Sequence, residues 1–432
     1  MDSIQFESLP REELEAVQLQ RLQETCLRAF NRVPHYKESF DKIGIKPEDV
    51  KSLKDLSSLP FTVKQDMRNN YPFGLFAESM DNVVRIHSSS GTTGKPTVVG
   101  YTAEDMNAWN EIMIRVYRMA GLNSSDIMHN AYGYGLFTGG LGFHTAAEQM
   151  GMAVVPSSGG LTSRQLMLMK DYGATVLGCT PTFALHLAEV AQKEGYDLKN
   201  DFKLRAGIFG AEPVSPGLKE EIEKVWGIQY FETYGLSEIM GPGVSGSCPH
   251  SRYLHIAEDH FIPEIIDPET FDPLPYGERG ELVFTTITKQ AIPLIRYRTK
   301  DLTTLHAEPC ECGRTLLRME SIVGRSDDML IIGGVNVFPS QIEHVIAQIE
   351  GLSLNYIIIA DKKGHLDRLE LEVEVAETIE IADDEKMSKL KNELKEGIRN
   401  HLYVNANVIL VATGTLARSE GKAVRVIDKR SS

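Results

Sequence analysis

Cysteine is scarce in this chain, and long apolar segments are missing from it. Five cysteines, unevenly spaced over 432 residues, are too few for a disulfide scaffold. No stretch approaches the ~20 apolar residues of a membrane-spanning helix. The first residues include Asp2, Glu7 and Arg11 and contain no apolar run of the kind found in a secretory signal. These absences predict a cytoplasmic protein.

Basic residues are also fewer than acidic ones. The chain has 45 Lys and Arg against 60 Asp and Glu, which gives a formal net charge of −15 at pH 7. So acidic a surface repels phosphate backbones and anionic lipid, which argues against nucleic acid and membrane partners. An anionic small-molecule substrate must therefore meet a few locally placed Lys, Arg or glycine-rich positions.

The order of the apolar segments indicates an α/β fold over the first three hundred residues. Apolar residues at helical spacing predict an amphipathic helix from Arg11 to Asn31. Further along, short apolar runs alternate with helical stretches, which favours a parallel sheet. The predicted strands are Val83–His87, Met152–Val155, Ala174–Gly178 and Leu204–Phe209, and the helices between them are Ser163–Tyr172, Thr182–Glu194 and Pro216–Val225.

The pattern changes after about Gly324. Leu369–Val375 alternates apolar residues with glutamates, as a half-exposed antiparallel strand does. Two more strands and a charged helix are predicted at Ile357–Ala360, Asn407–Val411 and Asp384–His401. We therefore expect a large N-terminal α/β domain of mostly parallel sheets, residues 1–325, and a small C-terminal α+β domain, residues 326–432.

The most informative segment is Ser88–Thr97, with the sequence SSSGTTGKPT. Hydroxyl side chains, two glycines and a lysine make a loop whose backbone N–H groups can face phosphate oxygens. The Walker pattern needs four residues between its glycines and a Ser or Thr after the lysine. Here only two residues separate the glycines, and Pro96 disfavours a helical conformation for Lys95. A phosphate-binding loop of another class is indicated.

Four more motifs follow this loop in order. They are Tyr234–Glu238 (YGLSE), Tyr297–Asp301 (YRTKD), Gly324–Asp328 (GRSDD) and Gly421-Lys422. Together with the loop, they resemble the signatures of the adenylate-forming superfamily of acyl-CoA synthetases, luciferases and peptide-synthetase adenylation domains. Over nearly its whole length, the chain is similar to the phenylacetate–coenzyme A ligase family within that superfamily.

The resemblance implies ATP and coenzyme A as co-substrates and Mg²⁺ as a cofactor. The acid would attack the α-phosphate of ATP, so electrostatic stabilisation is the main catalytic task. Glu238 is the predicted magnesium ligand, and Lys422 and Lys95 are the predicted catalytic lysines, Lys95 assisting pyrophosphate departure. The predicted ATP- and AMP-binding residues are Ser88, Ser89, Ser90, Gly91, Thr92, Thr93, Gly94, Gly210, Ala211, Glu212, Pro213, Tyr234, Gly235, Ser237, Asp301 and Arg325.

The same resemblance implies a mobile C-terminal domain. Asp327 would be the hinge on which this domain turns after adenylation, so that one site serves two half-reactions. The turn would withdraw Lys422 and open a path for the coenzyme A thiol. Gly333, Gly334 and Val335 would then face the thioester side.

Three of the five cysteines form a separate candidate site within residues 245–315. Cys310 and Cys312 form a C-x-C-G knuckle, and Cys248 is followed by both His250 and His255. Three thiols and one imidazole suit a closed, structural zinc site. The resemblance favours His255 over His250, and free thiols are the alternative. Cys26 and Cys179 are expected to be buried apolar residues.

The aromatic segment after residue 131 is the candidate acid-binding pocket. Tyr132, Tyr134, Phe137 and Phe143, with glycines at 139, 140 and 142, suggest a flat and partly hollow pocket for an aryl or arylacetic acid. Phenylacetate is the predicted acid, with benzoate-like and indoleacetate-like acids as alternatives, because the bulky Phe143 can reshape the pocket.

Two other functions remain open at this point. One is an adenylation enzyme that loads a carrier-protein thiol, and the other is a nucleotide-binding regulator without catalysis. The second is disfavoured because Lys422, Glu238 and Asp301 are all present. A homodimer is expected by analogy alone.

Overall fold

The computed structural model describes residues 6–89, 95–327, 330–332, 335–363, 366–417 and 425–430. These residues form two compact units. The first takes its residues from 1–179, 199–211 and 228–321, and the second from 180–198, 212–227 and 322–432. The predicted domain boundary between residues 325 and 326 stays a prediction. In the described part of the chain, no helix is long and apolar enough to span a membrane.

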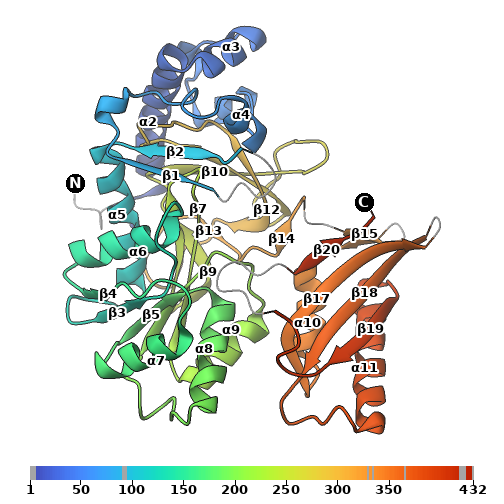
Figure 1. The fold of residues 1–432 in the computed structure, drawn as a ribbon. Coiled ribbons are helices and arrows are strands. Elements are labelled where there is room, and N and C mark those ends of the chain that lie inside the picture. Colours follow the sequence, from blue (N-terminus) through green and yellow to red (C-terminus); the bar gives the residue numbers. More distant parts are fainter. Residues whose placement is uncertain are drawn as a thin grey trace. The chain divides into compact units, whose positions relative to one another are not determined.

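Helices occupy both units (Figure 1). The longest ones lie where apolar residues recur at helical spacing, as predicted for the stretch from Arg11. The α-helices are α2 (Arg11–Arg32), α3 (Pro34–Ile43), α4 (Lys64–Asn69), α5 (Ala103–Met119), α6 (Thr138–Gln149), α7 (Thr162–Asp171), α8 (Pro181–Lys193), α9 (Pro216–Trp226), α10 (Pro339–Ala347) and α11 (Asp384–Leu402). Short 3₁₀ helices are η1 (Pro47–Asp49), η2 (Leu53–Ser58) and η3 (Met80–Asn82).

The strands of the first unit are mostly short. They are β1 (Arg85–Ser88), β2 (Val98–Tyr101), β3 (Ile127–Asn130), β4 (Ala153–Val155), β5 (Val176–Cys179), β6 (Ala206–Phe209), β7 (Gln229–Leu236), β8 (Gly241–Cys248), β9 (Ser251–Ile256), β10 (Phe261–Ile266), β11 (Arg279–Thr286), β12 (Tyr297–His306) and β13 (Arg318–Met319). Those of the second unit are β14 (Gly324–Arg325), β15 (Leu330–Ile332), β16 (Val335–Val337), β17 (Leu352–Lys363), β18 (Leu366–Val375), β19 (Ala406–Val411) and β20 (Val426–Asp428).

One large mixed sheet organises the first unit. Its strand order is β10-β11-β12-β13-β9-β8-β7-β6-β5-β3-β4. The strands from β7 through β6, β5 and β3 to β4 are parallel, and those from β7 to β10 are antiparallel. The α/β class is thus confirmed, but the sheet is mixed and not mostly parallel as we expected. Its antiparallel half carries the YGLSE and YRTKD motifs.

The strand before the phosphate loop differs from its prediction. We expected Val83–His87 to be a buried strand of the parallel sheet. Instead, β1 pairs antiparallel with β2 in a separate two-stranded sheet, with His87 opposite Val99. Val84 and Ile86 on this hairpin are exposed, so their apolar character does not reflect burial in a core.

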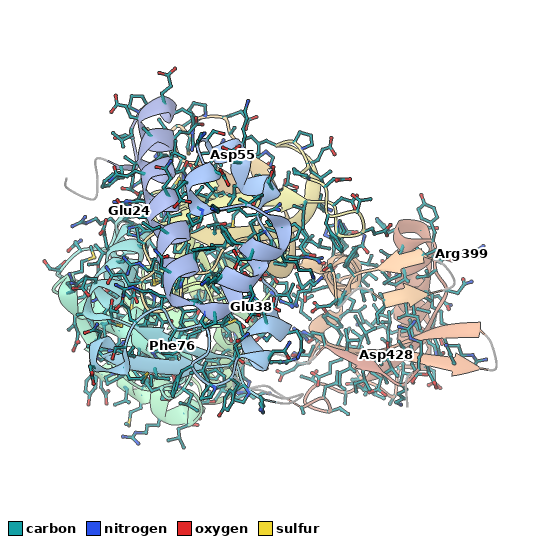
Figure 2. All side chains as sticks on the ribbon, turned by 90° about the horizontal axis from the view of Figure 1, so that it is seen from above. Glu24, Glu38, Asp55, Phe76, Arg399 and Asp428 are labelled. Carbon is teal, nitrogen blue, oxygen red and sulfur yellow. The ribbon has the colours of Figure 1, made fainter. Side chains whose placement is uncertain are left out.

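The N-terminal helix α2 is attached to the segment that follows β9. Leu14, Leu22 and Cys26 are fully buried on its inner face. Arg11 donates two hydrogen bonds to the carboxylate of Glu258, at 2.8 and 2.9 Å. Figure 2 shows Glu24 on the same helix, whose side chain is exposed and contributes to the acidic surface.

The second unit contains a four-stranded sheet with the order β19-β18-β17-β20. In β18, Leu369, Leu371 and Val373 are buried and Glu370 and Glu372 are partly exposed, as predicted, but Glu374 is fully buried. The strand pairs antiparallel with β17 and parallel with β19. Helices α10 and α11 lie beside this sheet and complete the unit's core (Figure 1).

A buried carboxylate joins the start of α5 to the segment before the YRTKD motif. Asp105 is fully buried, and its oxygens accept the backbone N–H groups of Thr102, Gln290 and Ala291 at 3.0, 2.6 and 2.9 Å. The first bond is half of a capping box, and Thr102 Oγ1 accepts the Asp105 N–H at 3.1 Å in return.

Replacing Asp105 by alanine should destabilise the protein. Three buried donors would lose their acceptor, which costs roughly 2–4 kcal/mol in unfolding free energy. Thermal unfolding should show a midpoint lowered by several degrees, while the exposed neighbour Glu104→Ala should leave it unchanged. Equal midpoints for the two variants would contradict this role of Asp105.

Candidate active site

The two described ends of the phosphate loop are closed by a hydroxyl network. The Ser89 N–H donates to the Thr97 carbonyl at 3.0 Å. In return, Ser89 Oγ accepts the Thr97 N–H at 3.1 Å and the Thr97 hydroxyl at 2.8 Å. Ser88 is buried at the end of β1. The remaining loop residues, Ser90, Gly91, Thr92, Thr93 and Gly94, lie outside the described residues.

Glu238 of the YGLSE motif lies at this closed base. Its side chain is 7% exposed, and Oε1 lies 3.3 Å from the Thr97 hydroxyl and 3.3 Å from Lys64 Nζ. A second ammonium, that of Lys289, lies 3.4 Å from the Glu238 carbonyl oxygen. Burial lowers the pKa of Lys289 to about 8. The carboxylate thus faces a cation and a hydroxyl, an environment that suits a metal and phosphate site.

Lys95, the lysine of the loop, is exposed. Its ammonium is 5.4 Å from the centroid of the Tyr71 ring, within the range of a cation–π interaction.

A short hydrogen bond joins two of the predicted nucleotide-binding residues. The Tyr234 hydroxyl donates to Asp301 Oδ2 at 2.6 Å. Gly235, the next residue, lies so close to the Gly241 carbonyl that a side chain would not fit. The register of β7 against β8 shifts here, a bulge that sets the direction of the Tyr234 side chain.

The YRTKD motif explains how Asp301 is held. Arg298 forms two 2.8 Å hydrogen bonds to the buried carboxylate of Glu281, on the neighbouring strand. Thr299 Oγ1 donates to the Leu282 carbonyl and accepts the Asp301 N–H. Lys300 has a left-handed backbone, φ 69°, next to a register shift between β11 and β12. This irregular turn fixes Asp301 against Tyr234.

The predicted strip from Gly210 to Pro213 has mixed surroundings. A side chain at Gly210 would collide with the Thr233 carbonyl, and Ala211 has a left-handed backbone, φ 74°. Glu212 belongs to the second unit, where its carboxylate accepts the Thr182 N–H at 2.6 Å. Burial raises the pKa of Glu212. This carboxylate therefore caps helix α8.

Ser237 contacts the predicted acid-binding segment. Its hydroxyl lies 3.0 Å from the Thr138 hydroxyl, at the start of α6. The YGLSE motif and the segment that precedes α6 are therefore linked directly.

In the second unit, the predicted hinge Asp327 is paired with a predicted nucleotide-binding residue. Arg325 donates to the two carboxylate oxygens of Asp327 at 2.8 and 3.0 Å. Val335 lies at the start of β16 and is partly buried. Gly333, Gly334 and the predicted catalytic Lys422 lie outside the described residues.

The aromatic residues of the predicted acid pocket do not share one environment. Tyr132 and Phe143 are buried and pack with ring centroids 4.5 Å apart. Tyr134 is partly buried, and its hydroxyl lies 2.7 Å from Asn130 Nδ2 and 3.0 Å from His144 Nδ1. Phe137 is 51% exposed. The side chains thus range from core to surface.

The hollow that we expected at the glycines of α6 is filled. The missing side chain of Gly142 lets the Trp109 ring pack against the helix. Gly140 lies against the Gly133 carbonyl. These glycines permit close packing and do not create open space.

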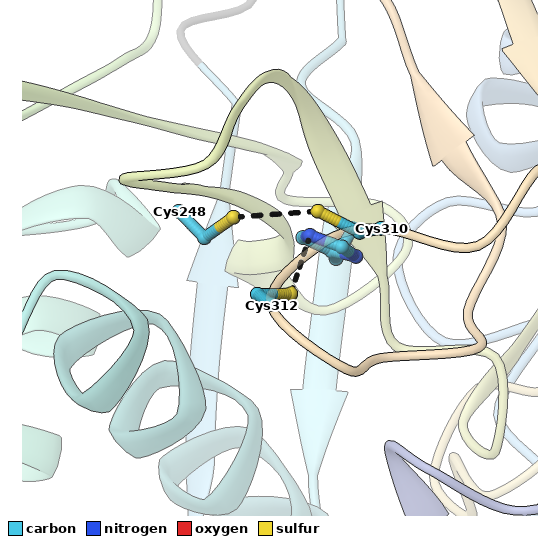
Figure 3. Close-up of side chains that lie close together, drawn as sticks. Cys248, Cys310 and Cys312 are labelled. Atoms are coloured by element: carbon cyan, nitrogen blue, oxygen red, sulfur yellow. Dashed lines mark hydrogen bonds between the residues drawn. The ribbon is translucent and has the colours of Figure 1, made fainter.

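The cysteine cluster assembles as predicted (Figure 3). The ligand atoms of Cys248, His255, Cys310 and Cys312 all lie within 4.8 Å of one another. The sulfurs of Cys248 and Cys310 are 3.8 Å apart, and Cys312 Sγ is 3.6 Å from His255 Nε2. Tetrahedral zinc with ordinary bond lengths separates such atoms by about 3.8 and about 3.6 Å. Burial lowers the pKa of His255 to about 3, so the ring is neutral, the form that binds metal.

Three residues at the site were not identified from the sequence as functional. His87 is buried immediately before the loop, Lys64 faces Glu238, and Thr138 contacts Ser237. Their residue types and spacing resemble those of ordinary surface or core positions, and only the position of His87 beside the loop could have drawn attention to it.

Comparison with known proteins agrees with this geometry. Residues 31–288 match the family model of AMP-binding enzymes, and residues 334–430 match that of the AMP-binding enzyme C-terminal domain. Phenylacetate-coenzyme A ligase of Thermus thermophilus is 46% identical over 99% of both chains. Phenylacetate-coenzyme A ligase of Escherichia coli is 47% identical over 100% of this chain and 98% of its own.

A solved structure matches the fold over the same extent. It is 2-hydroxyisobutyryl-CoA ligase in the postadenylation state with 2-HIB-AMP, which is 29% identical and covers 99% of this chain and 92% of its own, with a TM-score of 0.94. The family models and the near-complete coverage by close relatives establish that the chain belongs to the AMP-binding enzymes of the adenylate-forming superfamily, in the phenylacetate–coenzyme A ligase family.

Proposed function

We propose that the protein is an AMP-forming acid–coenzyme A ligase whose acid is phenylacetate. It joins the acid to the α-phosphate of ATP, releases pyrophosphate, and transfers the acyl group to the thiol of coenzyme A with release of AMP. The observation that carries this proposal is the 45–48% identity to phenylacetate-coenzyme A ligases over 96–100% of the chain.

In the first half-reaction, two anions must meet while charge builds on phosphate oxygens. The loop from Ser88 to Lys95 holds the β- and γ-phosphates in this proposal, and its closed base fixes where they lie. Glu238 is the ligand of Mg²⁺, which prefers few carboxylates together with phosphate oxygens and neutralises phosphate charge when bound. The 3.3 Å contact with Lys64 supports this role, because the carboxylate already faces a cation.

The nucleoside half of ATP is assigned to the antiparallel part of the sheet. Asp301 accepts hydrogen bonds from the ribose hydroxyls, a task that suits an acceptor-only carboxylate. Tyr234 and the strip from Gly210 border the adenine. The 2.6 Å bond from Tyr234 to Asp301 supports a shared site for base and ribose.

The second unit supplies the remaining proposed roles. Lys422 approaches the carboxylate and α-phosphate during adenylation, and Arg325 contacts ribose or phosphate. Asp327 is the hinge, and Gly333, Gly334 and Val335 face coenzyme A in the second half-reaction. The pairing of Asp327 with Arg325 supports a hinge that is linked to the nucleotide site.

The acid is assigned to the segment from Tyr132 to Phe143. Tyr132 and Phe143 pack against each other with ring centroids 4.5 Å apart, and so aromatic a segment supports a flat ring over a long flexible chain. The exposed Phe137 and the partly buried Tyr134 border the open side in this proposal.

We also propose a structural Zn²⁺ at Cys248, His255, Cys310 and Cys312. Four protein ligands leave no open position for chemistry, so the ion would join the β8–β9 region to the knuckle around Cys310. The donor set and its tetrahedral spacing support this assignment.

Three further proposals rest on analogy with the family and not on the site's geometry. They are a homodimer, a role in the breakdown of phenylacetate, and a cytoplasmic location, where ATP and coenzyme A are at hand.

AMP release from ATP and Mg²⁺ with phenylacetate should require coenzyme A for sustained turnover. Without coenzyme A, the acyl-adenylate stays bound to the enzyme. Only about one equivalent of AMP per chain should then be measured, released from the adenylate when the reaction is quenched. AMP measured by chromatography separates these cases. If no AMP forms with phenylacetate in either case while benzoate or indoleacetate supports turnover, the ligase stands and the acid is wrong. If no acid supports AMP release, the proposed function is wrong.

The purified protein should contain about one zinc per chain, as the four-ligand set requires. Cys312→Ser should reduce the zinc content measured by elemental mass spectrometry and lower the thermal midpoint, because the ion joins distant segments. Glu311→Ala, between the two knuckle cysteines, is the matched control and should retain both. A wild type that is purified without zinc, and whose thermal midpoint a chelator does not change, would contradict the site.

A further inference from the structure

His87 is a buried histidine to which the proposed function assigns no role. It lies at the end of β1, directly before the phosphate loop, and is 1% exposed. Its Nδ1 lies 3.0 Å from the backbone carbonyl of Leu136, in the acid-binding segment. The Ser88 N–H donates to the same carbonyl at 2.9 Å. Two groups at the base of the phosphate loop therefore converge on one oxygen of the acid-binding segment.

The contact fixes the proton on the imidazole ring. A carbonyl can only accept, so Nδ1 must carry the hydrogen, and Nε2 is then a bare lone pair. Nε2 is buried and has no hydrogen-bond partner among the described residues. Burial lowers the pKa of His87, and the nearby charges of Arg85 and Lys289 lower it further. The ring is thus neutral near pH 7 and donates from Nδ1.

Two aromatic residues hold the ring in place. The Tyr101 and Trp109 rings meet the His87 ring edge-on, with centroids 5.7 and 5.8 Å away, and stack on each other at 5.0 Å. The Tyr101 hydroxyl donates to the Met240 carbonyl at 2.7 Å, and Trp109 Nε1 donates to the Pro242 carbonyl at 3.0 Å. Those carbonyls lie just after Glu238. A shift of the ring would therefore disturb the segment that directly follows the YGLSE motif.

We propose that His87 is a positioning residue that couples the phosphate loop to the acid-binding segment through the Leu136 carbonyl. ATP bound at the loop would act on the end of β1, and the two hydrogen bonds would transmit this effect to the segment that contacts the acid. Each substrate would then bind more tightly in the presence of the other, by the same factor in both directions. This inference rests on the proposed function, because it requires ATP and the acid to bind at these two segments.

Two variants separate the hydrogen bond from the packing. His87→Phe keeps an aromatic ring between Tyr101 and Trp109 but removes the donor. His87→Asn removes the ring but places an amide N–H near the position of Nδ1. Calorimetry would measure the affinity for phenylacetate with and without a non-hydrolysable ATP analogue, at one magnesium concentration, alongside the thermal midpoint of each variant.

The wild type should bind phenylacetate at least about fivefold more tightly with the analogue present, the lower end of typical coupling. His87→Phe should reduce this factor to less than about twofold while remaining folded, and His87→Asn should retain most of it. A wild type without synergy, or a folded His87→Phe with the wild-type factor, would overturn the proposal. A variant that lost only thermal stability would show that the residue is structural.

The wild type alone offers a second test. At pH 7, ¹⁵N spectra of histidine-labelled protein should show His87 with a protonated Nδ1 and an unprotonated Nε2. The His87 signal is assigned by its loss in a folded variant or by its contacts with Leu136. The reverse tautomer would overturn the inference without any substitution. Failure of the wild type to release AMP with any acid would instead count against the proposed function.

Discussion

The closed base of the phosphate loop is the constraint on which the rest of the site depends. Ser89 and Thr97 exchange three hydrogen bonds, and the Thr97 hydroxyl also lies 3.3 Å from Glu238. Loop residues that bind phosphate through backbone N–H groups need ends that do not move, because a flexible anchor would cost ordering entropy at each binding event. Here those ends are tied to the carboxylate that is the proposed magnesium ligand.

Other segments are arranged around this base. Thr138, in the proposed acid-binding segment, contacts Ser237, and Asp105 holds the start of α5 against the segment before the YRTKD motif. Tyr234 and Asp301 meet where two strand irregularities turn both side chains toward each other. The proposed substrate-binding residues of the first unit therefore come from strand ends and bulges, while regular stretches of the sheet supply rigidity.

The sequence predicted the repeating elements well because their patterns are local. The helix from Arg11 and the strand from Leu369 follow from periodicity, and the structure forms both. The cluster of Cys248, His255, Cys310 and Cys312 joins distant segments, and it was predicted from ligand type together with the family resemblance. The sequence did not predict the antiparallel pairing of β1 with β2, since an apolar run does not identify its partner strand.

Contacts between distant residues could not be predicted from the sequence either. The glycines at 140 and 142 suggested a hollow, but the Trp109 ring and the Gly133 carbonyl fill the space that they leave. His87 has an ordinary residue type, and its significance lies in the Leu136 carbonyl, 49 residues away. Polar contacts of this kind follow from tertiary packing and have no local signature.

The proposed mechanism requires that an acyl-adenylate forms before coenzyme A takes part. Isotope exchange tests it most directly, by following labelled pyrophosphate into ATP with Mg²⁺ and no coenzyme A. Label should enter ATP only when phenylacetate is added, because the adenylation step is reversible and needs the acid. Exchange without any acid, or exchange that requires coenzyme A, would contradict the proposed order of the two half-reactions.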